Sequence, residues 1–307
     1  MDKLTVNKVL ENYYEDCELR KKLNQKTIKA YKIDLNQFLE YVNYQVDDYH
    51  VINDYIHYLN KIYDKVKTVK RKLASIKALY TYLEYQEIIE VTPFRRIRTE
   101  IKEPKILPKV IPDHLMNEIL TCLYIDIKAA QNDYQYKQAI RNGAIIELLF
   151  ATGIRISELC SLKNEDIDLK ERMIKIFGKG SKERYIYLGN DQVVNILVKY
   201  KKLTVHEESE YFFINKYHER LSEQSVRIYI QQLGQRLSQP IHLTPHMFRH
   251  TFATMLLDKD VDIRHIQKIL GHSSISITQI YTHVSNTKQK EILIAKNPRN
   301  DYMKIHI

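Results

Sequence analysis

The sequence predicts a mainly helical protein with two domains, the second of which contains a small antiparallel sheet. The chain has 307 residues, which is enough for about two domains that each bury a core. Glycine and proline each occur only seven times, whereas a fold built mainly of strands needs these turn residues often. Apolar residues recur at helical spacing along most of the chain.

Composition excludes several classes of protein. A hydrophobic content of 44% with evenly spread charges supports a packed core and argues against disorder. The longest apolar stretch, residues 144–151, is far too short to span a membrane. Charged residues near the start argue against a signal peptide, and the three separated cysteines form neither a disulfide framework nor a metal site. We therefore expect a protein of the reducing cytoplasm.

Residues 1–92 predict a helical bundle. Four helices are expected at residues 5–22, 27–42, 51–62 and 67–85, each with an apolar face. The last helix and the residues before it carry a basic run, which consists of Lys61, Lys65, Lys67, Lys70, Arg71, Lys72 and Lys77. Such a run is usually a solvated surface, but a helix that follows DNA phosphates also requires it. The net charge of +10 favours a polyanionic partner without deciding between the two.

Residues 93–112 have the composition of a linker. Four prolines in this stretch interrupt any long helix, and Arg95 and Arg96 begin a basic segment. The second domain is then expected at residues 113–307. Its predicted helices lie at residues 139–152, 156–162, 191–201, 222–237, 245–257 and 262–270. Strands at residues 173–177 and 185–188 flank a glycine turn and predict a hairpin, and residues 126–138 are expected to form an irregular insertion loop.

The densest group of chemically useful residues lies at the start of one of these helices. Thr244 suits the N-cap and Pro245 suits the first helical position. His246 and Arg249 then share a face near the helix N-terminus, where backbone N–H groups favour an anion. An imidazole beside a guanidinium can hold a phosphate and move a proton. The alternative for this motif taken alone is an ordinary surface pair of His and Arg. A metal site at His246 and His250 is disfavoured because Arg249 would repel a cation.

Other candidates are scattered along the second domain. Arg155 begins a helix after a glycine, and Lys179 lies between two glycines at the hairpin tip. His272 follows a glycine that ends a helix, and Tyr281 comes nine residues later. Each has an ordinary structural explanation when taken alone, since the chain contains 23 tyrosines and hairpin tips are often charged.

In their order and spacing, these residues resemble the tyrosine recombinases, which include the phage integrases and the Xer-type site-specific recombinases. The resemblance covers nearly the whole chain. Residues 27–41 are similar to the second helix of the family's core-binding domain, and residues 105–109 to its interdomain linker. The resemblance implies a helical, SAM-like core-binding bundle followed by a mixed α/β catalytic domain with a small antiparallel sheet.

The resemblance also implies a reaction. Tyr281 attacks a DNA phosphate and leaves a 3′-phosphotyrosine and a free 5′-hydroxyl. Lys179 protonates the departing 5′-oxygen, and His246 assists the proton of the tyrosine. The covalent bond conserves the energy of the phosphoester, so the reaction needs no ATP, no metal and no other cofactor.

The remaining residues of the family motif bind the phosphate. The resemblance implies that Arg155 and Arg249 contact its non-bridging oxygens, that His272 donates a hydrogen bond to it, and that Glu158 supports the site. Further DNA contacts are expected from Lys67, Lys70, Arg71, Lys77, Arg95 and Arg96.

The resemblance implies an assembly as well. A tetramer would hold two DNA duplexes at specific core sites, with the tail after Tyr281 packed on a neighbouring protomer and no contact with a membrane. A second recombinase or an accessory DNA-bending or regulatory protein is compatible with this arrangement. Asn142-Gly143 and Phe248 depart from the residues usual in chromosome-dimer resolvases, and these departures favour a mobile element or an inversion system.

Three alternatives stay open at the level of sequence. A type IB topoisomerase uses similar chemistry to relax DNA without site specificity. A non-catalytic DNA-binding relative would lack part of the motif, which is filled here. A basic helical scaffold with no DNA role predicts binding that is insensitive to salt, unlike the binding that phosphate contacts produce.

Overall fold

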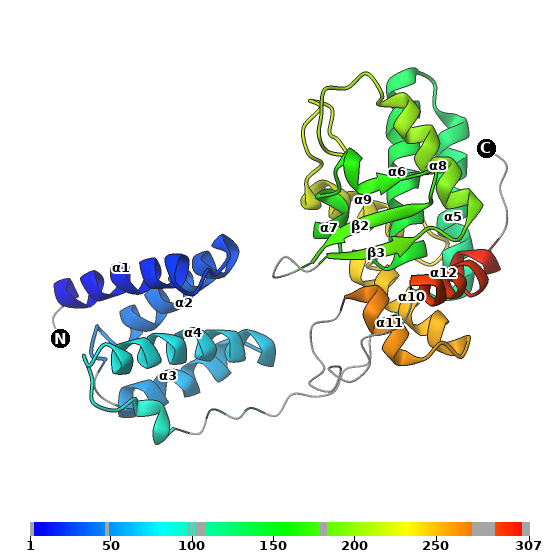
Figure 1. Cartoon of the computed structure of the whole chain (residues 1–307). Coiled ribbons are helices and arrows are strands. Elements are labelled where there is room, and N and C mark those ends of the chain that lie inside the picture. The colour runs from blue at the N-terminus through cyan, green and yellow to red at the C-terminus, as the bar shows by residue number, and fades with distance from the viewer. Residues whose placement is uncertain are drawn as a thin grey trace. The chain divides into compact units, whose positions relative to one another are not determined.

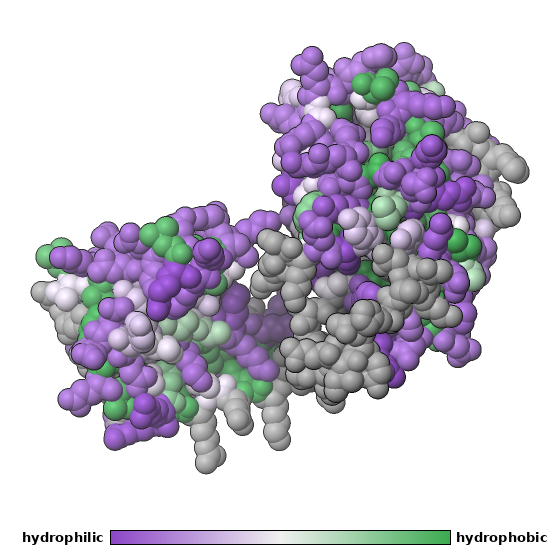
Figure 2. Space-filling model, in the orientation of Figure 1, coloured by the Kyte–Doolittle hydropathy of each residue, from purple (hydrophilic) through white to green (hydrophobic). Residues whose placement is uncertain are grey.

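The protein divides into two compact units, residues Met1–Ile106 and Leu107–Ile307, each with its own hydrophobic core (Figure 1). The structure is a computed structural model, and it describes residues 3–46, 49–97, 99, 101, 109–178, 183–271 and 286–302. The prediction of a mainly helical fold with a small antiparallel sheet is confirmed. Hydrophilic residues dominate the face shown in Figure 2. Among the described helices, none combines the length and the apolar character needed to cross a membrane.

The N-terminal unit is a bundle of the four predicted helices. They are α1 (Lys3–Leu19), α2 (Gln25–Tyr41), α3 (Tyr49–Ile62) and α4 (Val66–Tyr85), followed by the short 3₁₀ helix η1 (Pro93–Arg95). Aromatic rings fill the centre of this bundle. Phe38 contacts Tyr55 and Tyr80 edge to face, with ring centroids 5.2 and 6.2 Å apart.

A buried carboxylate organises the interior of the bundle. Asp34 of α2 is fully buried, and Nζ of Lys72 donates to its Oδ1 at 3.0 Å. Arg71 pairs with the other oxygen of Asp34. Lys72 is only 3% exposed, so its inclusion in a basic surface run was wrong. The reason is helical geometry, because Lys72 lies about 140° around the helix from Lys67.

Both ends of the predicted linker pack onto a unit. Phe94 and Ile97 are buried in the core of the N-terminal unit. Ile111 is buried in the core of the C-terminal unit, where its backbone N–H donates to Oγ1 of Thr251 at 2.8 Å. The two cores therefore extend a few residues into the stretch whose prolines predicted a linker.

The C-terminal unit surrounds a small sheet with helices. The helices are α5 (Asp113–Ala129), α6 (Asp133–Thr152), α7 (Ile156–Cys160), α8 (Asp191–Leu203), α9 (Glu223–Gln235), α10 (Pro245–Asp258), α11 (Ile263–Leu270) and α12 (Asn286–Ala295). The short 3₁₀ helices are η2 (Asn164–Asp166) and η4 (Pro298–Asp301). The strands are β1 (Ile167–Asp168), β2 (Met173–Phe177) and β3 (Glu183–Tyr187), antiparallel in the order β1-β2-β3. The predicted hairpin is β2 and β3, in which Ile176 pairs with Arg184.

Two expectations for this unit were wrong. Residues 126–138 are not an insertion loop, because α5 continues to Ala129 and α6 begins at Asp133. The side chain of Asn132 accepts a hydrogen bond from the N–H of Gln135 and so caps α6 three residues after α5 ends. The strand β1 was also missed, since two residues are too few to show any periodicity.

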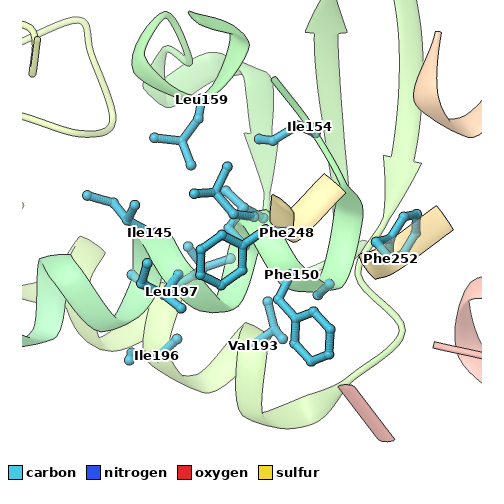
Figure 3. Close-up of a cluster of buried hydrophobic side chains, with 14 of the residues drawn as sticks. Ile145, Phe150, Ile154, Leu159, Val193, Ile196, Leu197, Phe248 and Phe252 are labelled. Atoms are coloured by element: carbon cyan, nitrogen blue, oxygen red, sulfur yellow. The ribbon is translucent and has the colours of Figure 1, made fainter. Parts of the chain in front are cut away.

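Helix α6 is the centre of the core of the C-terminal unit. It is buried on all sides from Gly143 to Thr152 and packs against α5, α8 and α10. In Figure 3, the ring of Phe248 from α10 lies among aliphatic side chains of α6, α7 and α8, which include Ile145, Leu159 and Leu197. This packing fixes the C-terminal end of α6 beside the start of α10.

The described part of the segment after Tyr281 consists of α12 and η4. These elements pack on their own unit in the single chain (Figure 1), and the expected packing of the tail on a neighbouring protomer stays a prediction. The side chain of Arg299 is 1% exposed and pairs with the fully buried carboxylate of Glu147, with Nε to Oε2 at 2.7 Å. Gly189 contacts α12 so closely that an added Cβ would lie 2.1 Å from the carbonyl oxygen of Leu293. A buried carboxylate that needs a partner explains this docking.

Candidate active site

Two arginines from distant parts of the sequence meet at the end of α11. Nη1 and Nη2 of Arg249 donate to the carbonyl oxygens of Gly153 and Leu270, both at 2.7 Å. Nη2 of Arg155 donates to the carbonyl oxygen of Gly271 at 3.1 Å, and its Nη1 lies 3.5 Å from that of Leu270. The fold thus brings together the two arginines that the motif predicts as phosphate ligands.

Glycines at two helix ends make this convergence possible. Gly153 ends α6 with φ of 61° and Gly271 ends α11 with φ of 63°, both in the left-handed region where side chains are strained. An added Cβ at Gly153 would lie 2.7 Å from side-chain atoms of Leu270 and of Phe252. The chain therefore turns sharply and packs closely where Arg155 begins α7.

Glu158 links Arg155 to a third arginine. Its Oε2 accepts from the backbone N–H of Arg155 at 2.8 Å, and its Oε1 accepts from Nη1 of Arg155 at 2.8 Å. Arg184 of β3 donates to both oxygens, from Nη1 at 3.0 Å and from Nη2 at 2.8 Å. Glu158 thus lies beside Arg155, and its role as a supporting group stays a prediction.

Sequence reasoning missed Arg184. The available signal was its position on β3, two residues before the buried Ile186 and therefore on the same face of the strand. A charged residue on an inward face requires a partner, and Glu158 supplies one. The side chain of Arg184 is accordingly only 12% exposed.

The site carries net positive charge. Burial and the charge of Arg155 lower the pKa of Arg249 to about 10, so this guanidinium stays protonated at neutral pH. Burial alone would raise the pKa of Glu158, but its hydrogen bonds to Arg184 and Arg155 outweigh burial and hold that pKa below the usual value. Three guanidinium groups around one carboxylate leave two positive charges for an anion such as a phosphodiester.

His246 lies in the first turn of α10 and is exposed. Partial shielding from water and the positive charges of Arg249, Arg227 and Arg155 lower its pKa below the ordinary 6.5. The imidazole is therefore neutral at pH 7 and can accept a proton. Thr244 is the N-cap of α10 as predicted, but its side chain makes no capping hydrogen bond.

The other three predicted catalytic residues, Lys179, His272 and Tyr281, lie outside the described residues. In the sequence, Lys179 lies between β2 and β3, and His272 directly follows Gly271. Within the described part of the chain, no cluster of three or more His, Cys, Asp or Glu residues has the arrangement of a metal site.

The predicted DNA-contacting residues of the N-terminal unit lie on α4 and near η1. Those on α4 are Lys67, Lys70, Arg71 and Lys77, and those near η1 are Arg95 and Arg96. All are exposed except Lys70, which is half-buried. Arg71 pairs with Asp34, and Nη2 of Arg95 donates to Oε1 of Glu84 at 3.1 Å.

Comparisons with known sequences place the chain in a family. Residues 126–288 match the phage integrase family, and residues 10–87 match the SAM-like N-terminal domain of phage integrases. The chain is 49% identical over 297 residues to a tyrosine recombinase of Agathobacter rectalis, covering 95% of this chain and 97% of that protein. It is 32% identical over 300 residues to tyrosine recombinase XerC of Bacillus pumilus, covering 94% of this chain and 95% of that protein.

Solved structures of the same fold include recombinase–DNA complexes. The XerH site-specific recombinase bound to its difH substrate matches with a TM-score of 0.68 and 22% identity, over 92% of this chain and 82% of that one. A lambda integrase tetramer bound to a Holliday junction matches with a TM-score of 0.65 and 17% identity, over 89% and 75% of the two chains.

The fold, the clustered arginines and these matches define a DNA-cleaving and rejoining enzyme. The chain belongs to the phage integrase family of tyrosine recombinases.

Proposed function

We propose that this recombinase exchanges DNA strands at specific sites through a 3′-phosphotyrosyl intermediate formed by Tyr281. The observation that carries the proposal is the convergence of Arg155 and Arg249 on the carbonyl groups of Gly271 and Leu270, at the end of α11. The chain continues directly from that point to His272 and Tyr281. A bound phosphodiester would meet a cationic site next to the segment that supplies the nucleophile.

The proposed reaction is a substitution at phosphorus. The Tyr281 oxygen forms a bond to phosphorus while the bond from phosphorus to the 5′-oxygen breaks. The phenol proton goes to the neutral imidazole of His246, and Lys179 supplies a proton to the 5′-oxygen. Arg155 and Arg249 stabilise the charge on the non-bridging oxygens, and His272 donates a hydrogen bond to them. Attack by a 5′-hydroxyl reverses these steps and rejoins the strand.

The proposed setting follows from the relatives and from the charge of the chain. The lambda integrase structure is a tetramer on a Holliday junction, and the same arrangement on two core sites is proposed here. The basic residues of α4 and η1 would contact phosphates outside the cleavage site. The enzyme would act in the cytoplasm, where its DNA is, as the recombinase of a mobile element or an inversion system.

The test is covalent capture of DNA. Duplexes that tile the DNA flanking the gene, each nicked near a possible cleavage position, lose a short 5′-hydroxyl fragment after cleavage and so trap the adduct. The wild-type protein should form an adduct that survives denaturing electrophoresis on one of these duplexes. Tyr281→Phe should form none and should still bind that duplex.

Two results would contradict the proposal. An adduct of undiminished yield from Tyr281→Phe would remove this residue as the nucleophile. Relaxation of arbitrary supercoiled plasmids by the wild-type protein, without strand exchange between two copies of the captured site, would instead indicate topoisomerase activity.

A further inference from the structure

We propose that Arg184 is a positioning residue for DNA cleavage, which holds Glu158 so that Arg155 stays available to the phosphate. This inference rests on the proposed function and assigns a role to a residue outside the family motif used above. It follows from the way in which one carboxylate is shared between two guanidinium groups.

Glu158 is bound more fully by Arg184 than by the side chain of Arg155. Arg184 contacts both carboxylate oxygens, at 3.0 and 2.8 Å, in the two-pronged geometry that matches a guanidinium to a carboxylate. The side chain of Arg155 contacts only Oε1, at 2.8 Å. Glu158 is 6% exposed, so water cannot replace a lost partner.

This sharing has a consequence for phosphate binding. If Arg184 were absent, Arg155 would be the only guanidinium bound to a buried carboxylate. Glu158 would then draw Arg155 into a full ion pair and compete with the phosphate for its N–H groups. With Arg184 in place, the negative charge of Glu158 is already balanced. Arg155, whose side chain is 33% exposed, can then turn N–H groups towards a ligand.

Arg184 also fixes the end of α11. Its Nε donates to the carbonyl oxygen of Ile269 at 3.0 Å. Its guanidinium lies so close to Gly271 that an added Cβ there would be 2.9 Å from Nη1 and 3.1 Å from Cζ. Arg184 is thus packed against the residue that precedes His272, and it holds β3 against both α7 and α11.

Arg184 also lies close to the end of the β2–β3 ladder. It pairs with Ile176 in the β2–β3 register, one pair before the last residues of the ladder, Phe177 and Glu183. In the sequence, Lys179 lies between Phe177 and Glu183. The side chain of Arg184 therefore connects the hairpin strand β3 to Glu158 and Arg155. Lys179 is the proposed acid, and Arg155 is a proposed phosphate ligand.

The experiment measures cleavage and binding separately, using the nicked duplex on which the wild-type protein forms its adduct. Arg184→Gln is expected to lower the single-turnover rate of adduct formation roughly 10- to 100-fold, because a misplacement of about 1 Å at a reacting group costs that much. The dissociation constant for the same duplex should change less than about 3-fold, since one buried contact contributes little to a large phosphate interface.

A matched control separates positioning from general destabilisation. Arg236 also makes a two-pronged pair, with Asp126 at 2.7 and 2.6 Å, but in a different part of the unit. Arg236→Gln should leave the cleavage rate near the wild-type value. If Arg184→Gln proves unfolded by circular dichroism, Arg184→Lys replaces it, because lysine keeps a charge against Glu158 without the paired contacts.

A double-mutant cycle tests the route through Glu158. If Arg184 acts through Glu158, the rate of the variant with both Arg184→Gln and Glu158→Gln should be no lower than that of the slower single variant. Losses that multiply would overturn the inference, and so would an Arg184→Gln variant that cleaves within about 3-fold of wild type. Either result leaves the proposed function intact, whereas failure of the wild-type protein to form any adduct would count against the proposed function itself.

Discussion

Three arginines bind three consecutive carbonyl groups, those of the last two residues of α11 and of its cap residue Gly271. Arg184 binds the carbonyl of Ile269, Arg249 binds that of Leu270, and Arg155 binds that of Gly271. The final carbonyl groups of a helix have no partners within the helix and carry partial negative charge. Guanidinium groups satisfy these carbonyls and are fixed in place without losing their own charge. The site is therefore organised for an anion before DNA arrives.

His246 provides a prediction at the scale of one residue. Because its pKa lies below 6.5, the neutral form that accepts a proton is lost only as the pH falls below that value. The cleavage rate should therefore rise with pH and level off before neutrality, with a midpoint below 6.5. Single-turnover rates on the captured duplex between about pH 4.5 and 8 would show this limb.

Substitution of His246 tests whether this residue causes the acid limb of the pH–rate profile. His246→Ala should slow cleavage and remove the acid limb, whereas the exposed His242→Gln should leave the profile unchanged. A limb that persists in His246→Ala would assign the titration to another group.

At the scale of elements, the buried pair between α6 and η4 holds the C-terminal segment. Nε and Nη2 of Arg299 donate to the two oxygens of Glu147 at 2.7 and 3.0 Å. The hydroxyl of Tyr124 donates to Oε1 of Glu147 at 2.7 Å. The side chain of Asn297 donates to the carbonyl oxygen of Ala151 at 3.0 Å. These contacts fasten η4 to α5 and α6, in the unit that also carries Arg155.

Loss of the ion pair between Arg299 and Glu147 should lower the stability of the protein. Arg299→Gln leaves an uncompensated buried carboxylate, so we expect unfolding free energy to fall by about 3–5 kcal/mol. Lys259→Gln is the control, because it removes an exposed pair with Asp301 and should cost less than about 1 kcal/mol. Denaturant titration of the two variants compares them directly. Equal, small losses would show that the tail is not held by Arg299.

At the scale of the whole molecule, the charge of +10 is distributed over two units with separate cores. The helical repeat separates the cations of α4 into exposed and buried positions. Lys67, Arg71 and Lys77 lie on the exposed side, whereas Lys72 points into the bundle. Asp34 neutralises part of this charge from within by pairing with Arg71. The surface that remains suits the sequence-independent part of DNA binding.

Salt dependence measures that contribution. Lys67→Ala and Lys77→Ala should each weaken binding to the captured duplex and reduce the slope of log affinity against log salt by about 1, as expected for one lost phosphate contact. Lys8→Ala, an exposed lysine on α1, serves as the control and should leave the slope unchanged. Unaltered slopes in all three variants would remove α4 from the DNA interface.

The sequence by itself determined what depends on local pattern. Apolar periodicity located most helices within a few residues, and glycines marked the ends of α6 and α11. The spacing of His246 and Arg249 identified the start of α10 as a functional site. These features are readable because helix formation, capping and turning depend on residues only a few positions apart.

Only the tertiary structure decided which distant residues meet. Arg184 became part of the site because β3 packs on α7 and α11, and nothing near it in sequence signals Glu158. In the same way, Lys72 is interior because Asp34 is buried opposite it, and the tail folds back because Glu147 needs Arg299. Buried charges find their partners across the fold, and a partner that lies tens of residues away leaves no periodic trace in the chain.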